Sequence, residues 1–222
     1  MIMKSAEFSQ LVNIPADPVT LEGMLELPEN ASGIVLFAHG SGSSRLSPRN
    51  NYVARVLRDA GLGTLLIDLL TQHEDADYAT RFDIPLLTRR LLAATSWLQN
   101  EARTKSLSIG YFGASTGAAA ALRAAAAEGG KISAVVSRGG RPDLAGEEAL
   151  GKVAASTLLI VGGFDDVVIG LNQAAYRLLK CEKELVIVPG ATHLFEEPGT
   201  LEQVAKHAAH WFSQNLGPGK AA

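Results

Sequence analysis

Six short runs of apolar residues between residues 33 and 190 constrain the fold more than any other feature of this sequence. Most of them lack the alternation of apolar and polar residues that marks a strand with one solvated face. They therefore predict strands that are covered on both faces, as the strands of a parallel sheet are. The runs are GIVLFAHG, GTLLIDLL, LSIGYFG, ISAVVSRGG, STLLIVGG and ELVIVPG.

Helical patterns separate these runs. Residues 47–61 read SPRNNYVARVLRDAG, with Ser47 as a capping residue, Pro48 in the first turn and Gly61 as the stop. Strands that alternate with helices predict a doubly wound α/β sheet, whose ligand site lies beyond the carboxyl ends of the strands. The other helical patterns are IPLLTRRLLAATSWLQNEA, LNQAAYRLLK and LEQVAKHAAHWFSQ.

The first part of the chain has a different pattern. EFSQLVNI and VTLEGMLEL alternate between apolar and polar residues on either side of PADP, which predicts an antiparallel hairpin. Together with the six later runs, this hairpin predicts a mostly parallel sheet of about eight strands. We expect a single domain over residues 1–222, with a frayed tail at 217–222.

Charge and cysteine content exclude several classes of protein. The formal net charge is −3, and without a basic excess nothing indicates a nucleic-acid partner. Cys181 is the only cysteine, so no intramolecular disulfide can form and a reducing compartment is expected. No signal-peptide core and no run of about 18 apolar residues occurs, so we expect a cytoplasmic protein without a membrane partner.

Two reactive side chains follow ends of predicted strands. Ser115 lies in GASTG, where a strand meets an alanine-rich helix; Gly-x-Ser-x-Gly at such a junction turns the serine hydroxyl toward the cleft. The alternative is a serine in an ordinary glycine-rich turn. His193 follows the last strand and is the candidate base, because imidazole titrates near neutral pH. His39 is expected to be structural, and His207 and His210 to be solvated rather than a metal pair.

The acid that orients His193 lies in GGFDDVV, where Asp165 and Asp166 are both candidates. The order Ser, Asp, His along the chain is the order of α/β-hydrolases. The oxyanion requires two backbone N–H donors, for which we expect Thr116 and Ser41, with Gly42 as an alternative to Ser41.

The loop HGSGSS does not have the pattern of a phosphate-binding loop. It lacks the Lys-Ser/Thr ending, and Arg45 stands where the third glycine of a dinucleotide fingerprint would fall.

Four stretches resemble the dienelactone hydrolase-like branch of the α/β-hydrolase superfamily: LFAHGSGSSRLSPRN, GYFGASTG, GGFDDVV and GATHLF. The resemblance implies a hydrolase without a large lid that acts on an ester or lactone without a cofactor or metal. The family pattern Gly-x-x-Asp-x-x-Val aligns Gly162, Asp165 and Val168, which favours Asp165 as the acid. The founding members use a cysteine as nucleophile, whereas this chain has Ser115, so the dienelactone substrate does not carry over with the fold.

Four arginines near the predicted cleft are candidates for contacts with a substrate anion: Arg45, Arg49, Arg138 and Arg141. A guanidinium binds carboxylate and phosphate oxygens in a bidentate way. The alternative is that each arginine pairs with a nearby acid such as Asp143, Asp59 or Asp68.

The sequence thus predicts a serine hydrolase of small carboxylic esters or lactones. A peptidase or acyltransferase with the same residues stays open, as does a non-catalytic scaffold that binds a ligand or a protein. A homodimer is compatible with the sequence, but no feature of the sequence establishes one.

Overall fold

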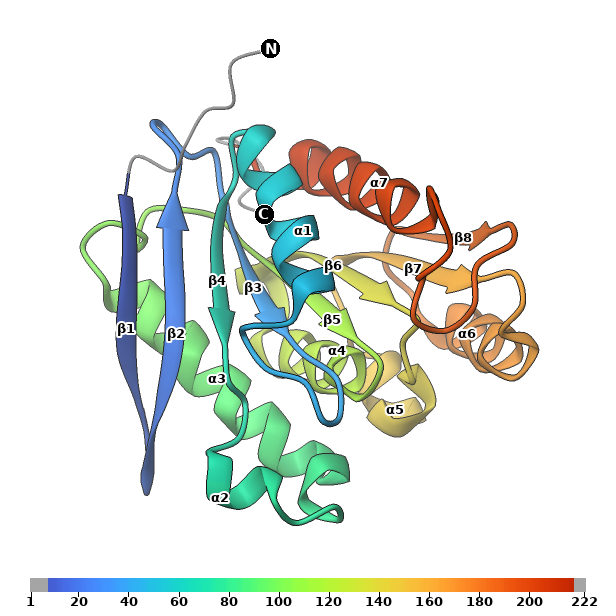
Figure 1. The fold of residues 1–222 in the computed structure, drawn as a ribbon, viewed down its shortest axis with the longest axis horizontal. Helices are drawn as coiled ribbons and strands as arrows, with labels where there is room; N and C mark the ends of the chain where they lie inside the picture. The colour runs from blue at the N-terminus through green and yellow to red at the C-terminus, as the bar shows by residue number, and fades with distance from the viewer. Residues whose placement is uncertain (1–7, 218–222) are drawn as a thin grey trace.

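The computed structural model describes residues 8–217, and these form one eight-stranded sheet in the order β1-β2-β4-β3-β5-β6-β7-β8 (Figure 1). β1 pairs antiparallel with β2, and β2 with β4, whereas every other neighbouring pair is parallel. The predicted hairpin and the mostly parallel sheet are therefore confirmed. The strands are β1 (Phe8–Ala16), β2 (Val19–Leu27), β3 (Ile34–Ala38), β4 (Gly63–Ile67), β5 (Ile109–Ala114), β6 (Ile132–Arg138), β7 (Ser156–Gly162) and β8 (Lys183–Val188).

Helices cover both faces of the sheet (Figure 1). α1 and α7 lie on one face, and α3, α4 and α6 lie on the other. No helix within residues 8–217 has the length and apolar character needed to cross a membrane. The helices are α1 (Pro48–Asp59), α2 (Gln72–Asp75), α3 (Ile84–Asn100), α4 (Thr116–Glu128), α5 (Glu147–Leu150), α6 (Asp166–Leu178) and α7 (Thr200–Asn215), with 3₁₀ turns η1 (Thr80–Phe82), η2 (Gly129–Lys131) and η3 (Pro142–Ala145).

The apolar runs lack alternation because the central strands are buried on both faces. In β3, Ile34 and Leu36 point into the core under α3 and α4, while Val35 and Phe37 point into the core under α1 and α7. All four side chains are almost fully buried. Both faces of the strand must then be apolar, as the sequence pattern predicted.

Two boundaries show how closely the sequence anticipated the helices. α1 begins as expected, because the Ser47 side chain accepts a hydrogen bond from the Asn50 N–H. α6 begins at Asp166, five residues before the predicted pattern at Leu171. An acidic residue in the first turn is favourable for the helix dipole, so the segment from Asp166 to Val168 forms helix and Asp165 occupies its N-cap position. The tail predicted to be frayed lies, apart from residue 217, outside the described residues.

Candidate active site

Ser115 lies in a strained turn between β5 and α4. Its backbone has φ +50° and ψ −120°, a combination that a residue other than glycine adopts only where its surroundings enforce it. The enforcement comes from close packing, since a Cβ on Gly117 would lie 2.1 Å from the carbonyl oxygen of Ala38. The Ser115 N–H donates to the Arg138 carbonyl oxygen at 3.3 Å, which ties the turn to the end of β6.

His193 pairs with Asp165 across two neighbouring loops. Its Nδ1 lies 2.6 Å from Asp165 Oδ2, and the two side chains are 39% and 16% exposed. Asp166 is exposed as the first residue of α6, and no hydrogen bond of its side chain is found among the described residues. The geometry therefore brings Asp165, and not Asp166, to the histidine. With Nδ1–H donating to the carboxylate, Nε2 is left as a proton acceptor.

Ser115 and His193 both border the backbone of Arg138 and Gly139. A Cβ on Gly139 would lie 3.1 Å from the His193 carbonyl oxygen and 3.6 Å from its Cε1. Within residues 8–217 no hydrogen bond joins the Ser115 hydroxyl to a His193 nitrogen. Such a bond is often long without a substrate and shortens in the reacting complex. Phe195, two residues after His193, has φ +56° and is buried.

The two expected oxyanion donors face the same small recess. Ser41 and Thr116 both line a cavity of about 10 Å³, close to the space that one water-sized group needs. Thr116 is the first residue of α4, and its N–H meets no acceptor in the described part of the chain, nor does that of Ser41. The alternative donor, Gly42, lines this recess too.

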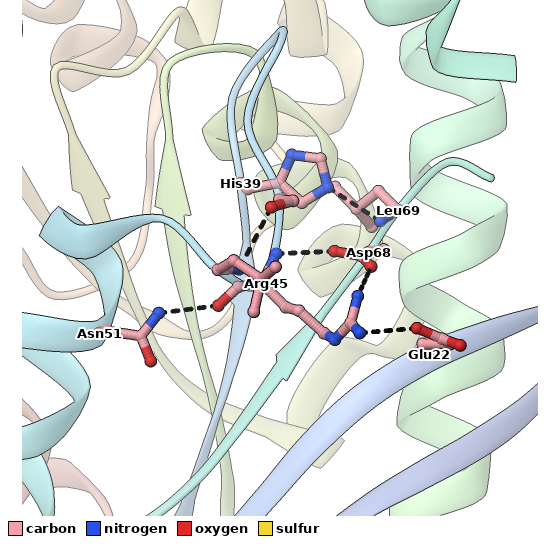
Figure 2. A network of polar contacts seen from close by, with 8 residues as sticks. Glu22, His39, Arg45, Asn51, Asp68 and Leu69 are labelled. Atoms are coloured by element: carbon pink, nitrogen blue, oxygen red, sulfur yellow. Dashed lines mark hydrogen bonds and ion pairs between the residues drawn. The ribbon is translucent and has the colours of Figure 1, made fainter. Parts of the chain in front are cut away.

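His39 holds the loop after β3 in place, as predicted (Figure 2). Its Nδ1–H donates to the Gly40 carbonyl oxygen at 2.9 Å, and its Nε2 accepts from the Leu69 N–H at 2.9 Å. This pair of bonds requires the neutral ring. Burial lowers the pKa of His39 below its usual 6.5, and the bond to Gly40 offsets part of that shift.

Arg45 anchors the far end of the loop that follows β3. Its N–H donates to Asp68 Oδ1 at 2.7 Å, and its guanidinium bridges the carboxylates of Asp68 and Glu22 (Figure 2). Asn51 in α1 donates to the Arg45 carbonyl oxygen at 2.8 Å. Asp68 is therefore an acid that pairs with one of the four candidate arginines, which is the alternative that the sequence left open for Arg45.

A cavity of about 560 Å³ lies beside this network. Residues of β2 line it together with the loops that follow β3 and β4. Hydroxyl, amide and carboxyl groups alternate there with leucines, so the cavity has both polar and apolar walls. Its lining residues are Thr20, Leu21, Glu22, His39, Ser43, Ser44, Arg45, Leu46, Asp68, Leu70, Thr71, Gln72 and Asp75.

The four candidate arginines have unlike surroundings. Arg45 is paired as described above, and Arg141 forms two hydrogen bonds with Asp143, at 2.9 and 2.7 Å. Arg49 pairs with Glu196 at 2.9 Å. Arg138 has no acidic partner among the described residues, and its Nε and Nη1 atoms are buried without a hydrogen bond.

Sequence reasoning missed two contributions to this region. Glu22 comes from the N-terminal hairpin, which had no predicted place at the site. Arg81 lies against the loop after β3, with Nη1 3.3 Å from where a Gly42 Cβ would be, and is held by Asp75. The only signal was the polar run from Thr71 to Phe82, which reads equally well as a solvated loop.

The sheet order, the turn at Ser115 and the pairing of His193 with Asp165 define an α/β-hydrolase. Comparison with solved structures agrees. A dienelactone hydrolase from Anabaena variabilis is 57% identical with a TM-score of 0.91, over 94% of this chain and 98% of that one. The chain belongs to the dienelactone hydrolase-like family of α/β-hydrolases. Est1E from Butyrivibrio proteoclasticus shares the fold, with a TM-score of 0.79 at 18% identity over 92% of this chain and 98% of its own.

Curated relatives carry a different name. Two Mycobacterium tuberculosis sequences with the provisional name phosphoribosyl transferase are each 60% identical to this chain over 209 residues. The match covers 94% of this chain but 47% of each relative, so the chain spans about half their length. No protein-family model matches the chain.

Proposed function

We propose that this chain is a serine hydrolase that cleaves a small carboxylic ester or lactone through an acyl-enzyme intermediate. The observation that carries the proposal is the hydrogen bond between His193 and Asp165. The His193 loop packs against Gly139, next to the Arg138 carbonyl oxygen to which the strained turn of Ser115 is hydrogen-bonded. The names of its structural relatives, a dienelactone hydrolase and esterases, support the same class of reaction.

The mechanism follows from these contacts. His193 Nε2 takes the proton of the Ser115 hydroxyl as the oxygen attacks the carbonyl carbon, and Asp165 stabilises the imidazolium. The N–H groups of Thr116 and Ser41 donate to the oxyanion. The imidazolium then gives its proton to the leaving alkoxide, which departs as the alcohol.

Water completes the cycle. His193 takes a proton from a water molecule that attacks the acyl-serine, and returns it to Ser115 as the carboxylic acid leaves. A peptidase or an acyltransferase would use the same groups with another leaving group or acceptor. A comparison of ester, amide and alcohol-acceptor substrates separates these reactions, and we expect ester hydrolysis to dominate.

Labelling with a fluorophosphonate probe tests the nucleophile. The native chain should react, and Ser115→Ala should not react at all. His193→Ala should react at least about a hundredfold more slowly, because general-base catalysis contributes two to four orders of magnitude. The exposed Asp166→Asn is the matched control for Asp165→Asn: the former should label as the native chain does and the latter much more slowly.

Absence of labelling in a folded native chain would contradict the proposal and favour a non-catalytic scaffold. The site offers no observation that favours phosphoribosyl transfer by this chain. The hydroxyl of Ser115, the imidazole of His193 and the carboxylate of Asp165 are the groups that acyl transfer requires. Acyl transfer is therefore the only chemistry that we propose for this chain.

A further inference from the structure

The cavity of about 560 Å³ between β2 and the loops after β3 and β4 has no part in the mechanism proposed above. Its volume is within the range of small-molecule sites, about 300–1,000 Å³. The hairpin reaches it because β2 runs antiparallel to β4, and the Glu22 carbonyl oxygen accepts from the Asp68 N–H at 3.0 Å directly after β4 ends. The cavity therefore has room for more of a substrate than its reacting carbonyl group.

This cavity adjoins the small recess of the expected oxyanion donors. His39, Leu70 and Asp75 line both spaces, whereas Ser41 and Thr116 line the recess alone. A carbonyl oxygen held by the two backbone N–H groups would thus have the larger cavity beside it. One part of the same substrate can occupy that cavity while its carbonyl group reacts.

The charged groups of the cavity neutralise one another. The Arg45 guanidinium lies 2.6 Å from Glu22 Oε2 and also pairs with Asp68 (Figure 2). The Asp75 carboxylate pairs with Arg81, from η1, at 3.1 Å. Each carboxylate therefore already has a guanidinium partner. A charged ligand would lose its hydration without gaining a free counterion, so the cavity favours an uncharged one.

Three uncharged polar side chains of the cavity have no hydrogen-bond partner within residues 8–217. They are the hydroxyls of Thr20 and Ser43 and the amide of Gln72, which come from β2, the loop after β3 and α2. A hydroxyl and an amide can each donate and accept, which is the pattern that hydroxyl groups of a ligand match. Leu21 and Leu70 are buried in the wall and offer apolar surface to the C–H groups of such a ligand.

The sheet order indicates which part of an ester would enter the cavity. Ser115 follows β5, and His193 follows β8, which lies three strands away on one side of β5. The cavity lies on the other side of β5, toward β3, β4 and β2. In the proposed mechanism His193 gives its proton to the leaving alkoxide, so the alcohol portion lies on the His193 side. The acyl portion is then the one that extends past the oxyanion donors into the cavity.

We infer that this cavity binds hydroxyl groups carried by the acyl portion of the substrate. The inference rests on the proposed hydrolase function and narrows its substrates to esters or lactones of hydroxylated carboxylic acids without a further charge. Thr20, Ser43 and Gln72 supply the hydrogen bonds that select for those hydroxyl groups.

A matched pair of esters tests this selection. Ethyl butanoate and ethyl 2,3-dihydroxybutanoate differ only in two hydroxyl groups of the acyl chain. After correction for their hydroxide-catalysed rates, the native chain should have a kcat/KM at least about tenfold higher for the dihydroxy ester, because each hydrogen bond contributes a few-fold. The ratio of the two kcat/KM values should fall about three- to tenfold in each of Thr20→Val, Ser43→Ala and Gln72→Ala.

Ser213→Ala and Gln214→Ala are the matched controls. Both side chains are exposed in α7 and do not line the cavity, so these variants should keep the native ratio. An equal ratio in the native chain and in all three cavity variants would overturn the inference. A higher kcat/KM for anionic monoethyl succinate, or for cationic ethyl 4-(trimethylammonio)butanoate, than for the dihydroxy ester would also overturn it, because the cavity would then hold a charge.

Direct binding of a neutral probe separates the cavity from the reaction. 2,3-Dihydroxybutanamide and its control butanamide are titrated calorimetrically into the native chain and the same variants. The native chain should bind the dihydroxy amide more tightly than butanamide, and Thr20→Val, Ser43→Ala and Gln72→Ala should each weaken that binding about three- to tenfold. Ester hydrolysis without selective binding of the dihydroxy amide would overturn the cavity inference alone. Selective binding by a chain that neither reacts with fluorophosphonate nor hydrolyses any of these esters would overturn the hydrolase proposal and support the hydroxyl site.

Discussion

His39 shows how one buried side chain makes this fold sensitive to pH. Both ring nitrogens are used by the backbone, one as donor and one as acceptor, and the ring is 6% exposed. Protonation of Nε2 would remove the acceptor for the Leu69 N–H and place a charge in the core. The loop that carries Ser41 therefore depends on a neutral histidine.

We predict that His39 destabilises the protein below pH 6.5. The folded state keeps the ring neutral because burial lowers its pKa, while the unfolded chain takes up the proton as the pH falls through 6.5. The unfolded state then binds more protons, so the free energy of unfolding falls with pH by up to about 1.4 kcal/mol per unit. Urea unfolding of the native chain and His39→Gln between pH 5 and 8 measures this.

The variant should have the shallower slope below pH 6.5, and we expect it to start from a lower stability at pH 8 because it loses ring hydrogen bonds. Parallel slopes for the two proteins would show that His39 titrates alike in the folded and unfolded states, and the prediction would be wrong. The other histidines are common to both chains and cancel in the difference.

At the scale of the element, the junction of β5 and α4 depends on how closely backbone approaches backbone. Gly113 and Gly117 flank the turn, and a Cβ on Gly113 would lie 2.4 Å from the Ala118 Cα. Six of the eight alanines of α4 are buried for the same reason, since small side chains let the helix lie close to the sheet. These small residues hold Ser115 at positive φ.

Gly117→Ala should destabilise the protein by about 3 kcal/mol or more, because the new methyl group would meet the backbone of Ala38 and His39 rather than a side chain that could turn away. Gly170→Ala is the matched control. Gly170 lies inside α6 with no atom within 4 Å of an added Cβ, so alanine there should stabilise by about 0.4–1 kcal/mol. Chemical denaturation of the three chains checks both signs, and a Gly117→Ala protein as stable as the native one would contradict the packing argument.

At the scale of the whole molecule, the sheet lies between two apolar cores, one under α1 and α7 and one under α3, α4 and α6, and its strands contribute side chains to both. Neighbouring residues of one strand, such as Val35 and Leu36 in β3, point into opposite cores. Neither face can lose its helices without exposing apolar side chains of the same strands to water. The two layers should therefore lose their structure together.

We accordingly predict a single cooperative unfolding transition for this chain of 222 residues, with equal calorimetric and van't Hoff enthalpies. The enthalpy should be about 150 kcal/mol near 60 °C, from the usual value per residue. Differential scanning calorimetry at neutral pH measures both quantities. Two resolved transitions would mean that the chain contains separate folding units, against the single domain expected from the sequence.

The candidate active-site residues could be found from the sequence because each follows a recognisable strand. A run such as LSIGYFG or ELVIVPG predicts a buried strand locally, and parallel strands bring their carboxyl ends to one edge. The positions of these strand ends, together with the family pattern, were enough to select Ser115, Asp165 and His193 as candidates. The start of α6 was missed because glycine and aspartate are as common in loops as at helix amino ends.

The sequence could not show which of the four candidate arginines pair with an acid of the chain. Arg45 meets Asp68, 23 residues away, whereas Arg49 meets Glu196, 147 residues away. Arg141 alone has its acid, Asp143, within the same short stretch. Nothing local to Arg138 indicates that no acidic side chain within residues 8–217 pairs with it.

The sequence by itself therefore determined the class of fold, the edge of the sheet at which the site lies and the residues expected to react there. The fold class, the sheet edge and the candidate residues follow from sequence periodicities of two and 3.6 residues and from turn motifs. These patterns reflect interactions between residues that are near neighbours in the chain. Only the tertiary structure decided which charges pair, which histidine is neutral and which guanidinium has buried N–H groups without a partner among the described residues. Ion pairs and burial depend on distances between residues far apart in sequence, and the folded chain alone sets those distances.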